Sequence, residues 1–140
     1  MKKLNLNIKL SEVVRKRVED GLDKDGKPKF KEVNVPSYEV AIQWLSVMME
    51  RAINRPRVDV RTGRLVPTVE VQMPTQRKYG KVMDALEAHK EGIAEIEDDD
   101  FSFLDSKFHQ AEISVERELN KILIEIDNSI NQAKAVPKKE

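Results

Sequence analysis

Residues 38–53 constrain the fold more than any other segment, because apolar side chains occupy most of the circumference of the helix they predict. The polar positions in this segment fall at helical spacing: Glu39, Gln43, Ser46 and Glu50. A helix with so narrow a polar stripe must be covered by other elements on most sides. We therefore expect a central helix over residues 37–54, with Ser37 as its N-cap and Pro56 just beyond its end.

Extended segments are predicted on the N-terminal side of this helix. Residues 4–10 alternate strictly between apolar and polar side chains, as a half-buried strand does, and a weaker alternation follows. Residues 23–28 have the composition of a turn, since Gly26 adopts a positive φ without strain, and an extended pattern resumes over residues 30–35. We expect two or three antiparallel strands over residues 4–35.

A second hairpin is predicted on the C-terminal side, with strands at residues 58–60 and 69–73 around a turn at 61–64. Pro67 lies in the return segment, so that strand is at an edge or begins after the proline. Three further helices and one short extended piece are expected, at residues 75–90, 99–111, 114–134 and 93–96. Three signals mark the helix ends: Gly92 after the second helix, Asp98 or Asp99 before the third, and Ser114 before the last.

Together these segments predict an α+β fold, with one antiparallel sheet built from the two hairpin regions and packed with about four helices. The length of 140 residues fits a single domain. We place this domain at residues 1–134, followed by a flexible tail at 135–140.

The last predicted helix carries an apolar seam that recurs every three or four residues: Val115, Leu119, Ile122, Ile126, Ile130 and Ala133. The spacing is close to a heptad repeat, but the seam is too short for a coiled coil. Two interpretations stay open. Either Ile122, Ile126 and Ile130 bind a protein partner or a second copy, or the seam packs in the protein's own core.

The formal net charge of zero conceals an uneven distribution along the chain. Residues 1–81 carry 18 Lys and Arg against 10 Asp and Glu, whereas residues 82–140 carry 7 against 15. Such asymmetry bears on association rather than on fold. Three arrangements accommodate it: the halves face each other within one molecule, copies associate head to tail as a homo-oligomer, or the first half binds an anionic partner.

Several classes of function are disfavoured by what the sequence lacks. It has no Cys, which removes disulfides, thiolate nucleophiles and cysteine metal sites. Polar side chains interrupt residues 1–10, unlike a signal peptide, and no apolar run approaches the length of a membrane span. Phosphate-binding Gly loops and hydrolase motifs are also missing. We therefore expect a non-enzymatic cytoplasmic protein that has no cofactor and does not bind membranes.

Two acidic segments partly match metal-binding patterns. Residues 21–32 place several acids at calcium-loop positions, but Gly21 stands where the first ligand is needed, and four lysines would repel a cation. Residues 97–100 are consecutive carboxylates of the kind that begin a helix and stay solvated. We expect a hairpin turn at the first segment, no metal at either, and surface or capping roles for His89 and His109.

Five arginines lie within 14 residues in and before the second predicted hairpin: Arg51, Arg55, Arg57, Arg61 and Arg64. A β-ribbon that carries Arg can enter a nucleic-acid groove, and Arg makes planar contacts to phosphates and bases. The turn faintly resembles the DNA-binding arm of bacterial histone-like proteins. The candidate nucleic-acid residues are Arg55, Arg57, Arg61 and Arg64, and the alternative is a solvated hairpin whose charges protect its edge.

Short motifs follow a fixed order in the second half of the chain: Arg77, residues 82–87 (Val-Met-Asp-Ala-Leu-Glu), Gly92, residues 96–101 (Ile-Glu-Asp-Asp-Asp-Phe), Leu104 and an Ile-rich closing helix. Over residues 74–133 the chain resembles a group of small proteins encoded by tailed bacteriophages and prophages. The resemblance implies a phage accessory protein of the host cytoplasm or the virion, which works by binding another protein or itself. The arginine-rich segment 56–73 lies outside this resemblance.

The sequence thus supports two functional hypotheses. The first is a non-enzymatic phage-encoded interaction protein that assists virion assembly or binds a host component, and that self-associates. The second is a nucleic-acid-binding regulator that uses the arginine hairpin at residues 55–64. Convergence of the arginine side chains on one open face would favour the second hypothesis.

Overall fold

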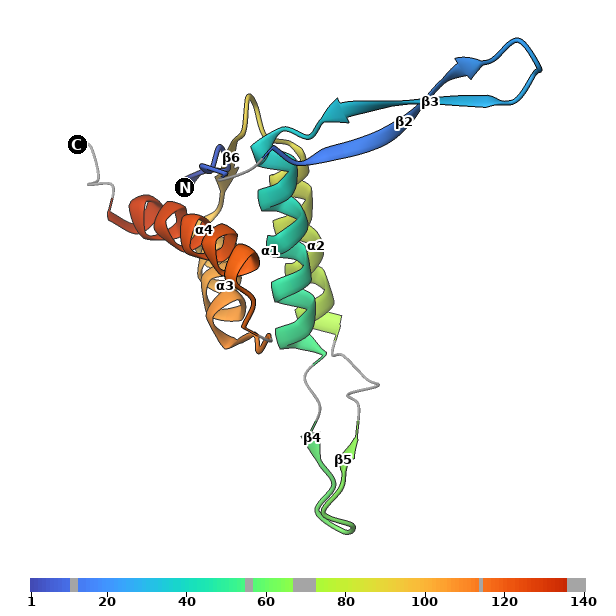
Figure 1. Cartoon of the computed structure of the whole chain (residues 1–140). Coiled ribbons are helices and arrows are strands. Elements are labelled where there is room, and N and C mark those ends of the chain that lie inside the picture. The colour runs from blue at the N-terminus through green and yellow to red at the C-terminus, as the bar shows by residue number, and fades with distance from the viewer. Residues whose placement is uncertain (11–12, 55–56, 67–72, 114, 136–140) are drawn as a thin grey trace.

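The computed structural model describes residues 1–10, 13–54, 57–66, 73–113 and 115–135. In these ranges the chain forms four helices and three two-stranded antiparallel ladders (Figure 1). The elements follow in the order β1 (Lys2–Asn5), β2 (Arg15–Leu22), β3 (Pro28–Asn34), α1 (Ser37–Ile53), β4 (Arg57–Val58), β5 (Leu65–Val66), α2 (Met73–Glu87), β6 (Ile93–Ile96), α3 (Asp98–Gln110) and α4 (Arg117–Ala135). The α+β class and the four predicted helices are confirmed.

Helix α1 lies in the middle of a helical body, as its narrow polar stripe predicts. Ala41, Leu45 and Met49 of this helix are at most 1% exposed, and α2, α3 and α4 all contact it. The other helices add fully buried side chains to the same core: Leu86 from α2, Leu104 from α3, and Ile126 and Ile130 from α4. Because a buried side chain of this size contributes about 1.5–3 kcal/mol, the body supplies most of the stability of the fold.

Strand β1 pairs with β6, which is distant in sequence, and not with the neighbouring hairpin. All four residues of β1 pair antiparallel with β6, and the N–H of Leu6 donates to the carbonyl of Gly92 at 2.6 Å. Leu4 and Ile96 lie on the covered face of the ladder, at most 1% exposed. The strand predicted over residues 4–10 is therefore shorter and earlier than expected.

The prediction of one sheet built from the two hairpin regions is wrong in its connectivity, because each hairpin forms a separate ladder. In β2–β3 the register places each apolar side chain opposite a charged one: Val18 opposite Lys31, Phe30 opposite Glu19, and Val33 opposite Lys16. Since the side chains of a strand alternate between its two faces, Phe30 lies on the face opposite to both valines. Neither face therefore offers a helix a continuous apolar surface.

Two hairpins project from the body, one near each end of α1 (Figure 1). The long arm comprises β2, β3 and their turn (residues 15–34), and the short arm comprises β4, β5 and their turn (residues 57–66). The turn expected in the long arm is confirmed, since Oδ1 of Asp23 accepts hydrogen bonds from the N–H groups of Asp25 and Lys27, both at 2.9 Å. This local bonding shapes the tip without contact to the body.

Helix ends differ from the prediction by one or two residues. Pro36, rather than Ser37, occupies the N-cap of α1, and this position has no side-chain capping hydrogen bond. Glu97 occupies the N-cap of α3, so the predicted caps Asp98 and Asp99 lie inside the helix. The acids still lie in the first turn, where they are favourable to the helix dipole.

Other predicted boundaries lie partly outside the described residues. Met73, expected at the end of a strand, begins α2 instead, while residues 69–72 of that strand are not described. The predicted cap Ser114 is not described either. Of the predicted tail, Ala135 is the last residue of α4, and residues 136–140 lie outside the described ranges.

Candidate functional site

The long arm exposes nearly all of its side chains. Only Val18 and Val33 are partly buried, while Phe30 and Leu22 are 51% and 67% exposed. Contacts between the strands join exposed groups: Arg15 and Glu32 at 3.9 Å, Lys31 and Asp20 at 3.7 Å, and Arg17 over the ring of Phe30. A two-stranded hairpin on its own is at best marginally stable in water. The arm thus adds little to the stability of the fold, which makes it the first candidate for a binding element.

The base of the long arm is joined to the body. The N–H of Val35 donates to the carbonyl of Val14 at 2.7 Å, which continues the pairing toward α1. Nζ of Lys16 lies 3.2 Å from Oε2 of Glu39 in the first turn of α1. Because α1 begins at Ser37, shortly after β3 ends, the body determines the direction in which the arm projects.

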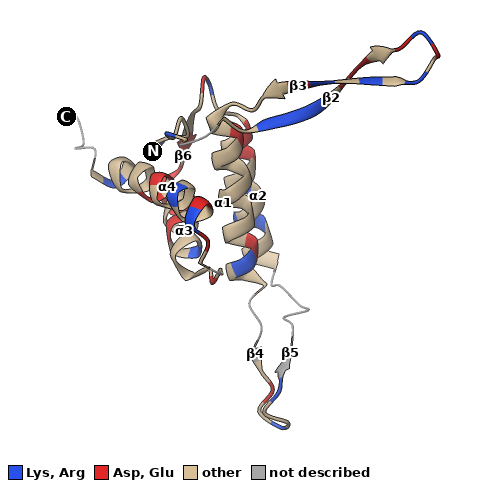
Figure 2. Ribbon diagram, in the orientation of Figure 1, with Lys and Arg blue, Asp and Glu red and all other residues tan. Residues whose placement is uncertain are grey.

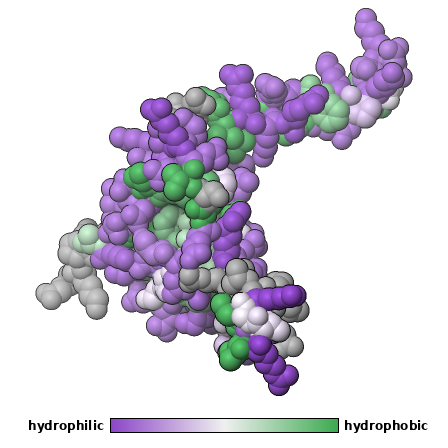
Figure 3. Space-filling model, turned by 60° about the horizontal axis from the view of Figure 1, so that its bottom comes forward, coloured by the Kyte–Doolittle hydropathy of each residue, from purple (hydrophilic) through white to green (hydrophobic). Residues whose placement is uncertain are grey.

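Charges of both signs are distributed along the long arm. Residues 15–34 contain seven Lys and Arg and five Asp and Glu, and Figure 2 shows both kinds along the ribbon. The part of the arm visible in the space-filling view is mostly hydrophilic (Figure 3). A mixed surface of this kind matches a protein partner better than it matches a uniformly anionic polymer.

The short arm brings two of the candidate nucleic-acid residues to one tip. Arg61 and Arg64 are both exposed there. Asp59 organises the turn, since its Oδ1 accepts a hydrogen bond from the N–H of Arg61 at 2.9 Å and its own N–H donates to the carbonyl of Arg64 at 2.9 Å. Val60 beside them is 98% exposed. The tip therefore combines two cations, one anion and one aliphatic side chain.

The other two candidate arginines are not placed at this tip. Arg57 lies in β4, where it pairs with Val66, and Arg55 lies outside the described residues. Of the four candidate arginines, only Arg61 and Arg64 have side chains that the structure describes, and both are exposed at the tip.

The partner-binding surface predicted on the closing helix is not open. Ile126 and Ile130 are 1% and 0% exposed, and Ile122 is partly buried against the same core. The prediction is wrong for Ile126 and Ile130, because β1 and α1 pack against α4. The alternative interpretation, in which the seam packs in the protein's own core, describes the structure.

His109 of α3 contacts one acid on its own helix, Asp105, and one on α4, Asp127. Its Nε2 lies 2.7 Å from Oδ1 of Asp127, and its Nδ1 lies 2.8 Å from the carbonyl oxygen of Asp105. Lys134 of α4 approaches the Asp105 carboxylate at 2.7 Å. Burial lowers the pKa of His109, but the hydrogen bonds to Asp105 and Asp127 and the charges of both acids raise it, and the net pKa is above 6.5. The protonated ring donates to both acceptors, and the bond to Asp127 connects α3 to α4, since Asp105 lies on the same helix as His109.

His89 also has a structural position. Its Nδ1 accepts a hydrogen bond from the N–H of Gly92 at 3.0 Å, and its ring lies 4.4 Å from the ring of Tyr38. These contacts stabilise the turn that leads from α2 into β6. The capping role expected from the sequence matches this geometry.

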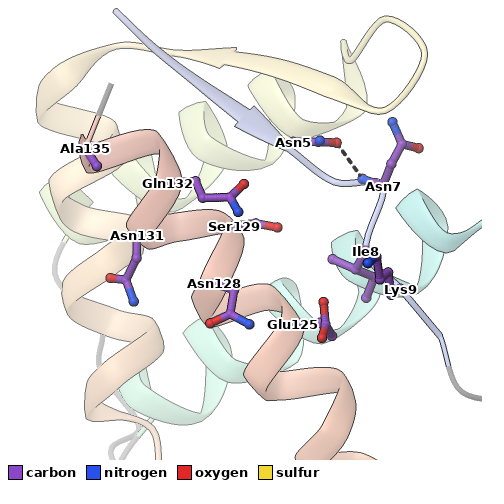
Figure 4. A pocket seen from close by; sticks show the side chains of 10 residues that line it. All are labelled: Asn5, Asn7, Ile8, Lys9, Glu125, Asn128, Ser129, Asn131, Gln132 and Ala135. Carbon is purple, nitrogen blue, oxygen red and sulfur yellow. Dashed lines mark hydrogen bonds between the residues drawn. The ribbon is translucent and has the colours of Figure 1, made fainter. Parts of the chain in front are cut away.

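A polar groove of about 660 Å³ lies between the β1 segment and α4 (Figure 4). Five of its lining side chains are amides: Asn5, Asn7, Asn128, Asn131 and Gln132. An amide both donates and accepts hydrogen bonds, so the groove matches the chemistry of a polypeptide main chain. This amide groove was not predicted from the sequence, and its signal was the amide-rich run from Asn128 to Gln132 beside the apolar seam.

Neither a cluster of metal-binding side chains nor a membrane-spanning helix is found among the described residues. Among the described residues, no group of three or more His, Asp or Glu is arranged to hold a metal ion. Within the acidic run, Asp98 and Asp99 are exposed, whereas Asp100 is buried at 7% exposure. In the same part of the chain, no helix has both the length and the apolar character that a membrane span requires.

Comparison with known proteins does not assign the chain to a family. No family model, no curated protein and no solved structure matches it. Its function is therefore inferred from the surfaces described above.

Proposed function

We propose that this chain is a non-enzymatic interaction protein that binds another protein through its long arm. The observation that carries the proposal is the uncovered ribbon, in which Phe30 and Leu22 stay exposed and neither face is packed. A protein that binds the folded arm stabilises it by mass action. Binding therefore gives the ribbon the covering surface that its own chain does not provide.

The dimensions of the arm support this role. The eight residues of β2 extend over roughly 26 Å at the rise of a strand. Helix α1, with 17 residues, separates the bases of the two arms by roughly 25 Å. A molecule of this shape reaches partners beyond its own body, as subunits and accessory proteins of assemblies do.

The resemblance of residues 74–133 to small proteins of tailed phages supports a more specific role. We propose that the chain is phage-encoded and that its partner is a virion component during assembly or a component of the host. Both alternatives use the same mechanism, which is complementarity to a mixed-charge ribbon with two exposed apolar side chains, Phe30 and Leu22.

The test is a shortened arm. Val18 and Lys31 face each other in the register, so residues 19–30 can be replaced by Asn-Gly, the preferred two-residue hairpin turn. We expect this variant to unfold at nearly the same urea concentration as the parent chain, because all of the removed residues are exposed. Proteins captured from infected cells and identified by mass spectrometry should be lost with the shortened arm.

A matched control is Lys121→Ala, which removes an exposed contact to Glu118 on α4 and leaves both arms intact. Captured partners should then be purified and titrated against the three proteins. If every partner binds the shortened chain as tightly as the parent chain, the long arm is not the binding element and the proposal is wrong.

A second candidate function is nucleic-acid binding by the short arm, and the exposed pair Arg61 and Arg64 favours it. Replacing Arg57, Arg61 and Arg64 by Ala should then weaken binding to duplex DNA and flatten its salt dependence, by about one unit of slope per lost phosphate contact. The matched control is Arg117→Ala on α4. Equal affinity of all three proteins for DNA at physiological salt would eliminate this candidate.

A further inference from the structure

The amide groove has two walls that come from opposite ends of the chain. One wall is the segment from Asn5 to Lys9, and the other is the side of α4 from Glu125 to Ala135 (Figure 4). In that view the side chains of Ser129 and Gln132 point from the helix toward the β1 segment. The volume of about 660 Å³ lies within the range of ligand-binding sites.

The amides of the α4 wall are available to a ligand. Asn128, Asn131 and Gln132 are exposed, and within the described residues their side chains form no hydrogen bond. On the opposite wall, Oδ1 of Asn5 already accepts a hydrogen bond from the N–H of Asn7 at 3.0 Å. The helix therefore supplies most of the free donors and acceptors of the groove, since every side-chain amide has both.

The polar residues of this wall recur at an interval that matches an extended polypeptide. Asn128 and Gln132 are four residues apart, and so are Glu125 and Ser129 in a second row beside them. Four residues of an α-helix rise roughly 6 Å, whereas an extended chain repeats its orientation every two residues, after roughly 6.6 Å. Each row can therefore meet equivalent peptide groups of a chain that lies along the helix.

The charge and composition of the groove argue against other classes of ligand. Lys9 and Glu125 are its charged residues, and their opposite charges leave no net attraction for a phosphate-bearing ligand. None of the described residues that line the groove is aromatic, so it lacks the rings on which nucleic-acid bases stack. A polypeptide main chain fits better, because it is neutral and has a donor and an acceptor at nearly every residue.

We propose that the amide groove is a second binding site, which takes an extended segment of a partner protein and recognises its main chain. The α4 wall from Glu125 to Ala135 is roughly 15 Å long and so accommodates about four or five extended residues. Asn128 and Gln132 bind alternate peptide groups of this segment. The site goes beyond the proposed arm function and does not depend on it, and a partner held at both places gains affinity through effective concentration.

The first test selects peptides and then removes two amides. Random eight-residue peptides displayed on ribosomes are selected against the parent chain, and fluorescence anisotropy measures the dissociation constants of the enriched peptides. We expect Asn128→Ala combined with Gln132→Ala to raise these constants by at least about tenfold, since two hydrogen-bonding groups are lost. Both residues are exposed helix positions, so the double variant should fold.

A matched control removes the same two types of amide elsewhere. Gln43 on α1 and Asn120 on α4 are exposed and do not line the groove, so Gln43→Ala combined with Asn120→Ala should leave the dissociation constants unchanged. The shortened-arm variant separates this result from the proposed function. It should bind the selected peptides like the parent chain, even if the long arm proves to bind nothing.

The second test determines whether the main chain is recognised. Methylation of one peptide nitrogen at a time removes one N–H from a selected peptide. Because successive N–H groups of an extended chain point to opposite sides, methylation should weaken binding at every second residue and have little effect at the residues between. This scan uses the parent chain, so it stays decisive if the double variant does not fold.

Three outcomes would overturn the inference. The first is a selection whose peptides bind the parent chain no more tightly than the Asn128 and Gln132 double variant. The second is a methylation scan without alternation. The third is a glycan array on which the parent chain binds a sugar that the double variant does not, since this result would assign the groove to a saccharide instead.

Discussion

Helix α4 and the long arm both contain apolar residues among polar ones, yet α4 packs in the body and the long arm projects from it. On α4 the apolar residues recur on one side of the helix, so Ile126 and Ile130 lie together under β1 and are nearly inaccessible. On the arm, Val18 and Phe30 lie on opposite faces and each faces a charged residue. The comparison shows that the burial of a segment depends less on how many apolar residues it has than on whether those residues share one face.

The largest expected effect comes from placing a charge in each region. Ile126→Asp buries an unpaired carboxylate in the core, at a cost of several kcal/mol against a typical total stability of about 5–15 kcal/mol. We expect this variant to be unfolded in buffer, whereas Phe30→Asp on the arm should change the stability by less than about 0.5 kcal/mol. Circular dichroism during urea unfolding measures both.

A control on α4 itself makes this comparison stricter. Ile124 is 49% exposed on the same helix, so Ile124→Asp should leave the stability nearly unchanged. If Ile126→Asp stays folded and instead loses self-association, the seam is an interface after all, and the contrast between the two regions fails.

A smaller effect is expected at two glycines, one in each region. Gly92 in the body and Gly26 in the arm have similar positive φ angles of 82° and 77°. A Cβ at Gly92 would collide with the side chain of Asn7, whereas a Cβ at Gly26 would meet open space. Gly92→Ala should therefore cost about 2 kcal/mol or more, from backbone strain and the disturbed Asn7 hydrogen bond to Glu91.

Gly26→Ala introduces backbone strain but no steric collision. The strain falls in an arm that contributes little to the free energy of global unfolding. Its urea midpoint should match that of the parent chain. Equal destabilisation by the two substitutions would mean that the arm and the body unfold as one cooperative unit, which would remove the distinction between them.

A still smaller effect is the pH dependence of the connection at His109. Because its pKa is raised in the folded protein, the folded state holds this proton more tightly than the unfolded chain. The stabilisation is complete below the unfolded pKa of about 6.5 and is lost as the pH rises through the folded pKa. Its size should be below about 1 kcal/mol, since the His109 side chain is 47% exposed and solvent screens the pairs.

His109→Asn should flatten the dependence of the unfolding free energy on pH between pH 6 and 8, as measured by urea titrations at several pH values. The arm provides the contrast. Lys31→Ala removes the exposed ion pair with Asp20 and should leave the pH profile of the unfolding free energy unchanged. A parent chain that becomes more stable as the pH rises through this window would contradict the assigned role of His109.

The smallest expected effect is that of calcium on the turn of the long arm, where we expect none. Oδ1 of Asp23 already accepts two main-chain hydrogen bonds, and Lys24 and Lys27 flank it. Isothermal titration calorimetry with calcium should give no binding heat beyond dilution. Saturable heat that disappears in Asp23→Asn would show that the arm binds a cation.

Much of the fold was predictable because its signals are local. The polar stripe of residues 38–53 indicated a central helix, and the turn chemistry at Asp23 and Gly26 indicated a hairpin, and both are present. The partner of β1 was not predictable in this way. Nothing in residues 1–10 specifies β6, which follows some ninety residues later along the chain. Pairing over such a separation depends on which apolar faces meet in the assembled core.

The candidate binding surfaces were predictable only in part. The arginine-rich turn was evident from composition, and its pair at the tip, Arg61 and Arg64, is exposed as the hypothesis requires. The amide groove was overlooked, because Asn5 and Gln132 become neighbours only when α4 packs against β1. Polar residues on a helix have no periodic signal that distinguishes a solvated face from the wall of a groove.

The sequence by itself determined the α+β class, the four helices and the two hairpins, since helical periodicity, turn residues and prolines act within a few positions along the chain. Only the tertiary structure decided that the seam at Ile126 is core and that the long arm is left uncovered. These outcomes depend on which surfaces compete for burial. Burial is determined by the whole set of packed elements, because a side chain can be covered only by residues that the fold brings next to it.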